Sequence, residues 1–484
     1  MSISGAMSNA LSGLTAASRA AETVSSNLSN IMNENYGRRD LNLSSRVIGS
    51  YGGVTVHSQT RHVDKALLND KRFAMADHAF ASGLASFHSR LEGLYGDPTD
   101  SRSLTSKIAG FESSLVLAAS MPESNQRLDA VVSRAKDIAT TLKKVSDGIQ
   151  QSRNNADREI ETTVSWLNTA LSQVSDLNGM IVSANALGND VSSLEDNRQK
   201  LISQISEIIP VREVPRDRGA VVLYSAGGAI LLDSSPAKLA FTPANFITPH
   251  MTQANGLLSG LTISGMAVDT DRTNGPISGG KLAALFNVRD TAGVAAQTEI
   301  DSVARDLVER FQAATVDTTR AVGDPGLFTD SGTVFDPADE VGLAGRLAVN
   351  SAVDPAKGGE VWRIRDGLGA AAPGAAGDAS LLQSLQQTLT DLRSPASGSF
   401  TGTSRSFASL GAGLLSQAGA QRETMEIDVS FANIRLGELT TRQLEDGVDS
   451  DYEMQRLMLV EQSYAANARM IETIDEMMKT LLRL

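Results

Sequence analysis

Both ends of this 484-residue chain carry apolar residues at the alternating spacing of three and four that defines a coiled-coil seam. Near the N-terminus nine positions follow this spacing without a break, and six of them hold large apolar side chains. These six are Ile3, Met7, Leu14, Val24, Leu28 and Ile31. A helix with one continuous apolar stripe has to cover that stripe against another element. The spacing therefore predicts a helix over 3–31 that needs a partner.

The C-terminal end repeats the pattern over the last thirty residues or so. Its seam positions are Leu457, Val460, Tyr464, Asn467, Ile471, Ile474, Met478 and Leu481. Asn467 is polar where the spacing calls for an apolar residue. Because the two terminal seams can pair with each other, we expect 1–45 and 447–484 to form one assembly domain built from both ends of the chain.

A second C-terminal stripe runs from Met425 to Leu439 and is out of register with the seam that follows it. The register changes across 447–449, where the sequence reads Gly-Val-Asp. A change of register of this kind predicts a kink or a short loop between two helices.

Between the ends the periodicity changes twice. Helical spacing assigns 46–210, 280–320 and 380–446 to a helical bundle. Within the first of these segments, one stripe holds Ile138, Leu142, Val145 and Ile149. Short apolar runs bounded by Gly, Asp and Pro predict strands in 211–279, and 321–379 is an irregular insert rich in Gly, Pro, Asp and Ala. The predicted fold is mainly α with β inserts: paired terminal coiled-coil helices, a helical-bundle middle domain and a small outer β-rich domain.

Composition excludes several classes of protein. The net charge is −13 and no block of Lys or Arg occurs, whereas a nucleic-acid-binding protein needs a positive face to displace counterions. A chain without cysteine forms neither disulfides nor thiolate zinc sites. The sequence has no long apolar run, so we expect no membrane span, and its first residues lack the basic and apolar regions of a secretory signal peptide.

The nearest matches to motifs of catalysis or ligand binding each lack an essential residue. The segment 275–282 has the Gly-x-x-x-x-Gly-Lys spacing of a phosphate-binding loop, but Leu282 stands where Ser or Thr must bind magnesium. In 269–280, Asn274 and Gly280 stand where a calcium loop needs Gly and Glu. We therefore predict that the protein is not an enzyme and that it has no catalytic, cofactor-binding or metal site. Paired catalytic carboxylates leave no sequence motif, so that alternative stays open.

The end sequences resemble a known family. At 26–38 the chain reads Ser-Asn-Leu-Ser-Asn-Ile-Met-Asn-Glu-Asn-Tyr-Gly-Arg, which is similar to the Asn-rich segment that closes the first helix of flagellar rod, hook and hook-associated proteins. The segments 447–454, 462–471 and 475–482 are similar to the C-terminal segments of the same family. Asn467 falls on a family position, so the polar residue in the seam belongs to the resemblance.

Mid-chain segments narrow the resemblance to the hook-associated members. They read Ser-Asn-Gln-Arg at 124–127, Asp-Asn-Arg-Gln-Lys-Leu at 196–201 and Gly-Gly-Lys-Leu-Ala-Ala-Leu at 279–285. The N-terminal segment departs from the family pattern at Met32 and Glu34, where small or neutral residues are usual.

The resemblance implies a structural subunit of the bacterial flagellum that joins hook to filament as an adaptor, with the two seams as its assembly interface. The implied partners are copies of itself in a helical ring, the hook protein, a second junction protein with the filament, and a flagellar export chaperone. The implied location is extracellular, at the hook–filament junction, reached by type III export without a cleaved signal peptide. Two alternatives remain: another axial protein such as hook or distal rod, and a ligand-binding module housed in the β inserts.

Overall fold

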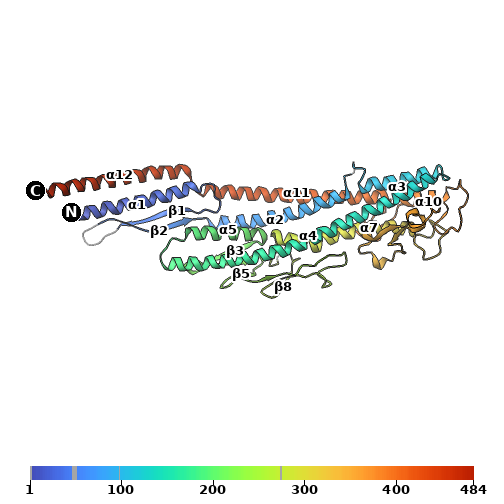
Figure 1. Ribbon diagram of the computed structural model, residues 1–484, viewed down its shortest axis with the longest axis horizontal. Coiled ribbons are helices and arrows are strands. Elements are labelled where there is room, and N and C mark those ends of the chain that lie inside the picture. The colour runs from blue at the N-terminus through green and yellow to red at the C-terminus, as the bar shows by residue number, and fades with distance from the viewer. Residues whose placement is uncertain (1–2, 46–51, 98, 273–274, 484) are drawn as a thin grey trace.

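The computed structural model describes residues 3–45, 52–97, 99–272 and 275–483. The molecule is elongated and mainly helical, and the two chain ends lie side by side at one end of the long axis (Figure 1). The described residues exclude Asn274 of the calcium-like segment and the predicted domain boundary at 46. The mainly α fold class with β inserts is confirmed.

The terminal part of the molecule contains two helices and a hairpin. Helix α1 (Ile3–Ser29) and helix α12 (Ser450–Leu481) come from opposite ends of the chain. Strands β1 (Arg38–Ser45) and β2 (Val54–His62) pair antiparallel and pack on α1. The predicted boundary at 45 falls inside this hairpin. Its strands carry polar side chains on both faces, so they give little of the alternating signal that marks a strand in a sequence.

Five long helices form the body of the molecule. They are α2 (Lys65–Tyr95), α3 (Leu104–Ala119), α4 (Asn125–Ala186), α5 (Ser192–Ile208) and α11 (Phe407–Glu445). Helix α4 has 62 residues and is therefore about 90 Å long. Asp64, Ser103, Ser124, Ser406 and Asp449 stand directly before α2, α3, α4, α11 and α12, and each side chain accepts a hydrogen bond from a backbone N–H of the first turn. Such N-caps fix where a helix begins.

Shorter helices complete the bundle. They are α6 (Gly280–Asn287), the π-helical turn η2 (Val288–Ala292), α7 (Gly293–Gln312), α8 (Leu343–Arg346), α9 (Arg363–Asp366) and α10 (Ser380–Thr390). Helix α10 ends at Thr390 and α11 begins at Phe407, so helical structure from 380 onward is interrupted by a loop that contains Pro395 and Gly398.

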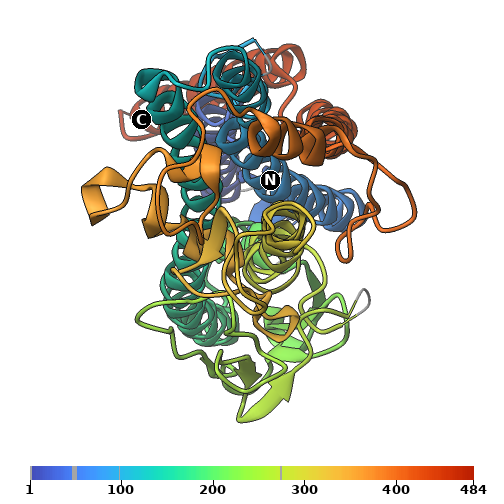
Figure 2. The same cartoon turned by 90° about the vertical axis from the view of Figure 1, so that its right-hand side faces the viewer.

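Three small antiparallel sheets lie in the inserts. The first contains β3 (Val211–Pro215), β4 (Val221–Ser225) and β5 (Ile230–Leu232). The second contains β6 (Leu239–Ala240), β7 (Leu261–Ile263) and β8 (Met266–Val268), and the third pairs β9 (Phe328–Asp330) with β10 (Leu347–Val349). In the end-on view, α4 runs down the left side of the molecule and α11 lies at the upper right (Figure 2).

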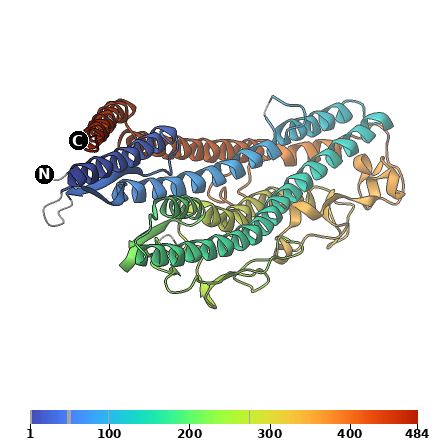
Figure 3. The ribbon, with the colours of Figure 1, turned by 60° about the vertical axis from the view of Figure 1, so that its left-hand side comes forward.

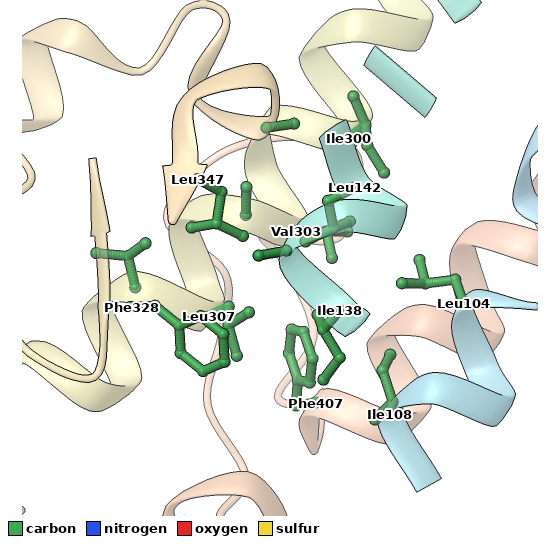
Figure 4. Packing of buried hydrophobic residues seen from close by; sticks show 14 of the residues in the cluster. Leu104, Ile108, Ile138, Leu142, Ile300, Val303, Leu307, Phe328, Leu347 and Phe407 are labelled. Carbon is green, nitrogen blue, oxygen red and sulfur yellow. The ribbon is translucent and has the colours of Figure 1, made fainter. Parts of the chain in front are cut away.

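Two hydrophobic cores hold the bundle together. The larger core lies at the end away from the chain termini and joins α3, α4, α7, α11 and the β9–β10 pair (Figure 4). The rings of Phe111, Phe311 and Phe328 meet there with centroids 5.3 to 6.0 Å apart. The second core packs the C-terminal half of α4 against α5 and the sheets that contain β3 and β7.

A cluster of buried charges attaches the insert to the middle of α4. The Arg289 guanidinium is fully buried and pairs with Asp157 and Asp290, each at 2.7 Å. It also donates to the carbonyl of Ser259 at 2.9 Å. Arg153 is likewise buried and donates to the carbonyl of Arg289 at 2.7 Å, and burial lowers the pKa of Arg153 to about 10.

Asp301 gives the bundle a dependence on pH. Its buried carboxylate accepts hydrogen bonds from the backbone N–H groups of Gly342 and Ala344 at 2.7 and 2.9 Å, and burial raises the pKa of Asp301 from 3.8 to about 6. The folded chain therefore holds this proton between about pH 4 and pH 6, where the unfolded chain has released it.

We expect this group's contribution to stability to fall by about 3 kcal/mol as the pH rises through that interval. Urea denaturation of the natural protein and of Asp301→Asn at about pH 4 and at neutral pH measures the effect. The difference in unfolding free energy between the two proteins should shift with pH in this direction. A difference that stays constant would contradict the assignment.

Candidate assembly interface at the two chain ends

Helix α1 lies between α12 and the β1–β2 hairpin (Figure 3). The predicted break at 447–449 is confirmed, because α11 ends at Glu445 and α12 begins at Ser450 after a short turn. The carboxylate of Asp449 caps α12 by accepting from the N–H groups of Asp451 and Tyr452 at 2.8 and 3.2 Å.

The structure brings only part of each predicted seam into contact. On the N-terminal side, Val24 is buried, Ile3, Leu14 and Leu28 are half-buried, and Met7 is exposed. The half-buried Ile31 lies past the end of α1 at Ser29.

On α12 only one of the eight seam positions is fully buried. Ile474 is buried, while Leu457, Val460, Asn467 and Ile471 are half-buried. The remaining seam positions, Tyr464, Met478 and Leu481, are exposed. Much of the apolar surface of α12 therefore faces away from its own chain.

The face of α1 that packs holds small residues that the seam pattern does not single out. Ala20 and Asn27 are buried, and Gly13 lies directly against Asn467 of α12. A Cβ added at Gly13 would come within 2.7 to 2.9 Å of the side-chain amide of Asn467. Asn467 thus occupies space that a side chain at position 13 would need, which explains the glycine there.

A Gly13→Val variant should loosen α12. The branched side chain has no room beside Asn467, and overpacking of this kind costs about 1–3 kcal/mol. We expect proteases to remove α12 from the purified variant faster than from the natural protein. Gly437→Val is the matched control, because a Cβ at Gly437 on α11 meets nothing within 4 Å. Equal digestion rates in the two variants would contradict the close approach.

A buried polar network, here called the end junction, joins the two chain ends. It consists of Asn27, Tyr36, Arg39 and Glu453. The Asn27 amide donates to the Arg39 carbonyl and to Glu453 Oε1, both at 2.9 Å. Asn27 Oδ1 accepts from the Tyr36 hydroxyl at 2.8 Å and from the Arg39 N–H at 3.0 Å. Asn27 and Glu453 are both fully buried, and burial raises the pKa of Tyr36, which keeps its hydroxyl protonated as the donor.

Asp196 of α5 ties this terminal part to the bundle. Its carboxylate accepts from the N–H of Gly37 at 3.1 Å and from the side chains of Arg39 and Arg61 at 2.9 and 2.7 Å. All three donors belong to the loop and hairpin that follow α1. A single carboxylate in the body of the molecule therefore fixes the position of the hairpin.

A second contact to the bundle uses Glu34, one of the residues that depart from the family pattern. Its carboxylate pairs with the mostly buried Lys71 of α2 at 2.6 Å. Lys71 also donates to Gln443 of α11 at 2.9 Å, and Gln443 donates to the Glu34 carbonyl at 2.6 Å. The loop after α1 is thus bonded to both α2 and α11.

The segment 275–282, which has the spacing of a phosphate-binding loop, makes a structural contact. Its Lys281 pairs with Glu159 of α4 at 2.7 Å. In the described residues no three His, Asp or Glu side chains form a group that could hold a metal ion. Within that same part of the chain, every helix is too short or too polar to span a bilayer.

Comparisons with known proteins give matches to flagellar proteins. A family model described as the helical domain of the flagellar hook-associated protein FlgK matches residues 88–327, and one described as the C-terminal part of the basal body rod proteins FlgEFG matches 446–484. "Flagellar hook-associated protein 1" of Bacillus subtilis is 23% identical over 97% of this chain and 96% of its own length. The protein of the same name from Escherichia coli K12 is 23% identical over the full length of both chains.

Two further similarities cover part of the chain. "Flagellar hook-associated protein 1" of Salmonella typhimurium is 26% identical over 60% of this chain and 57% of its own length. The solved structure of the flagellar hook junction protein FlgK from Burkholderia pseudomallei is 19% identical, covers 55% of this chain and 47% of that chain, and has a TM-score of 0.45, too low to support an inference about fold. On the matched segments and the full-length relatives, this chain belongs to the flagellar hook-associated protein 1 family, a family of structural proteins of the bacterial flagellum.

Proposed function

We propose that this protein joins hook to filament as a structural adaptor at the hook–filament junction, and that it does so without catalysis. The observation that most supports this is the helix pair made from the two chain ends. Its outer surface carries apolar side chains that the described part of the chain leaves about half exposed, including Met7, Tyr464 and Met478. Soluble monomers rarely leave such rows exposed, and larger exposed patches mark contact sites.

The seam positions are the proposed contact surface between subunits. The seam residues half-buried within one chain, such as Leu14 and Ile471, would be covered fully by α1 or α12 of a neighbouring copy. In this arrangement 1–45 and 447–484 form the inner assembly domain around the export channel. The bundle of 46–210, 280–320 and 380–446 surrounds it, and 211–279 with 321–379 faces outward.

The proposed partners follow from this arrangement. Copies of the chain form a ring, one surface of the ring binds the hook protein, and the other binds a second junction protein and the filament. The chain is proposed to reach this site by type III export without a cleaved signal peptide. A flagellar export chaperone would cover the apolar face of α12 before export.

Electron microscopy of a deletion strain tests the proposal. We expect hooks that end without a filament, together with flagellin released into the medium, and we expect a plasmid copy of the gene to restore filaments. Loss of a hook or rod protein would instead leave no hook. Normal filaments in the deletion strain would rule out the proposed function.

A Tyr464→Asp variant tests the seam on its own. Tyr464 is exposed, so the substitution should change the stability of the free subunit by less than about 0.5 kcal/mol. We expect it nevertheless to reduce filament formation, because a charge would be buried between subunits. Gln462→Asp introduces the same charge at an exposed position on the opposite face of α12 and serves as the control. Filaments in normal number with Tyr464→Asp would place the subunit contact elsewhere.

A further inference from the structure

A cavity of about 240 Å³ lies where helices α2, α7 and α11 meet, which is many times the space that one water molecule needs. Its floor is apolar, because Leu91 of α2, Ala296 of α7 and Leu414 of α11 line it and belong to the larger hydrophobic core. Thr291 and Ala292 of the π-helical turn η2 form part of its wall. Turns of this kind are frequent at functional sites.

Tyr95 at the end of α2 brings a polar group to this apolar floor. It lines the cavity and is only 3% exposed, yet its hydroxyl has no hydrogen-bond partner among the residues that the structure describes. Buried tyrosine hydroxyls usually have one. Burial raises the pKa of Tyr95, so the hydroxyl stays protonated and can both donate and accept. A molecule bound in the cavity would supply the missing partner.

The charge that acts on this hydroxyl is negative. The carboxylate of Glu299 on α7 also lines the cavity, and after burial it is the second cause of the raised pKa of Tyr95. Glu299 accepts hydrogen bonds from the N–H and the hydroxyl of Ser399, at 3.1 and 2.9 Å, and pairs with no cation in the described part of the chain. His88 lines the cavity as well, and burial lowers the pKa of His88, so its ring is neutral at neutral pH.

The cations on neighbouring segments make other contacts. Arg422 of α11 pairs with both Glu92 and Glu426, each at 2.6 Å. The guanidinium of Arg405 lies over the ring of Phe400, 4.9 Å from its centroid. The cavity is therefore electronegative, so it favours a bound cation over a bound anion.

We propose that this cavity, here called the amine pocket, binds an alkylammonium group, with the ammonium at Glu299 and the Tyr95 hydroxyl and the alkyl part over the apolar floor. A carboxylate has about four acceptor positions, so Glu299 can bind an ammonium and keep its bonds to Ser399. The ammonium belongs either to a free primary amine or to a lysine side chain of another flagellar subunit. The inference goes beyond the proposed function, because joining hook to filament needs no ligand in the bundle.

Thermal unfolding of the purified full-length chain tests the preference for charge. Butylamine, butanol and butyrate have the same alkyl length and carry a positive charge, no charge and a negative charge at neutral pH. At constant pH and ionic strength we expect butylamine alone to raise the midpoint, by about 2 °C at ten times its dissociation constant. No shift with butylamine, or an equal shift with butanol, would overturn the proposal.

Three substitutions in the amine pocket locate the binding. Tyr95→Phe and Glu299→Gln each remove one polar partner at nearly constant size, and Ala295→Leu narrows the cavity at an exposed lining position. Each should abolish the butylamine shift. Tyr95→Phe should leave the midpoint without ligand unchanged, because its hydroxyl makes no bond to the described residues. Glu423→Gln is the control, since Glu423 is an exposed carboxylate of α11 outside the lining. A full shift in Glu299→Gln would overturn the site.

Filament formation by Ala295→Leu in the deletion strain distinguishes the two sources of the ammonium. Normal filaments, together with a butylamine shift in the natural protein, assign the site to a free amine. Loss of filaments from a subunit that still folds assigns it to a lysine of a neighbouring subunit. Failure of the proposed function would show separately, as normal filaments in the deletion strain without any copy of the gene.

Discussion

An Asn27→Ala variant is expected to lose the ability to build filaments while its helical bundle keeps its stability. Asn27 is fully buried and makes all four hydrogen bonds that hold the end junction together. Of these bonds the one to Glu453 is fully buried, and a buried partner left without a bond costs about 1–3 kcal/mol, so the terminal part should lose at least about this much. Helix α12 has little else to hold it, because only Glu453 and Ile474 of this helix are buried.

The measurement has two arms. Filament formation in the deletion strain measures assembly, and urea denaturation of the purified protein measures the stability of the helical bundle. Asn33→Ala is the matched control, since Asn33 belongs to the same Asn-rich segment but is exposed. Filaments on cells that carry Asn27→Ala would show that the end junction is dispensable. A bundle that unfolds together with the chain ends would show that the two parts are not independent.

Arg289→Met should destabilise the bundle more than any surface substitution. The variant leaves the buried carboxylates of Asp157 and Asp290 without their cation, and breaking a buried ion pair from one side costs about 3–5 kcal/mol. The guanidinium also lies over the rings of Phe241 and Phe286, with centroid distances of 5.3 and 5.0 Å, so its packing is lost as well.

Urea denaturation monitored by circular dichroism measures this loss of stability. Arg102→Met is the control, because Arg102 is largely exposed and pairs with Asp100 at the surface, where an ion pair contributes about 0–1 kcal/mol. If the free energy of unfolding of Arg289→Met decreased by less than about 1 kcal/mol, water would have to reach the cluster and solvate the two carboxylates.

The helical layout could be predicted from the sequence because each helix buries one face in a regular rhythm. Ile138, Leu142, Val145 and Ile149 of α4 are all fully buried, as their spacing predicts. The break between α11 and α12 could also be predicted, because one straight helix cannot keep both stripes on the same face when the register changes. The β1–β2 hairpin was not, because its strands alternate weakly between polar and apolar residues.

The contact face of α1 shows where periodicity stops being informative. The spacing identifies a stripe of large apolar residues. It does not predict which edge of that stripe contacts the partner helix. In the folded chain α12 lies toward Gly13 and Ala20, and Met7 is left outside. A close approach between helices favours small residues, and small residues carry little weight in a hydrophobic pattern.

Polar contacts between distant parts of the chain could not be predicted from the sequence either. Asp196 and the Arg39 that it binds are 157 residues apart, so neither side chain signals the other in the sequence. The family resemblance contained part of this information, because both the Asn-rich segment 26–38 and the segment 196–201 that begins with Asp196 are similar to the family. Glu34, a departure from that resemblance, pairs with Lys71 and so has a structural use in this chain.

The end junction also sets an order of events. Asn27 and Glu453 are 426 residues apart, so their hydrogen bond can form only after nearly all of the chain between them has been made available for folding. Among the described residues, in contrast, neither bundle core contains a residue that follows α11. A subunit broken off before Ser450 would keep both cores yet present α1 without its helical partner. If the two ends form the assembly surface as proposed, a chain that lacks α12 would keep a folded bundle and still be unfit for incorporation.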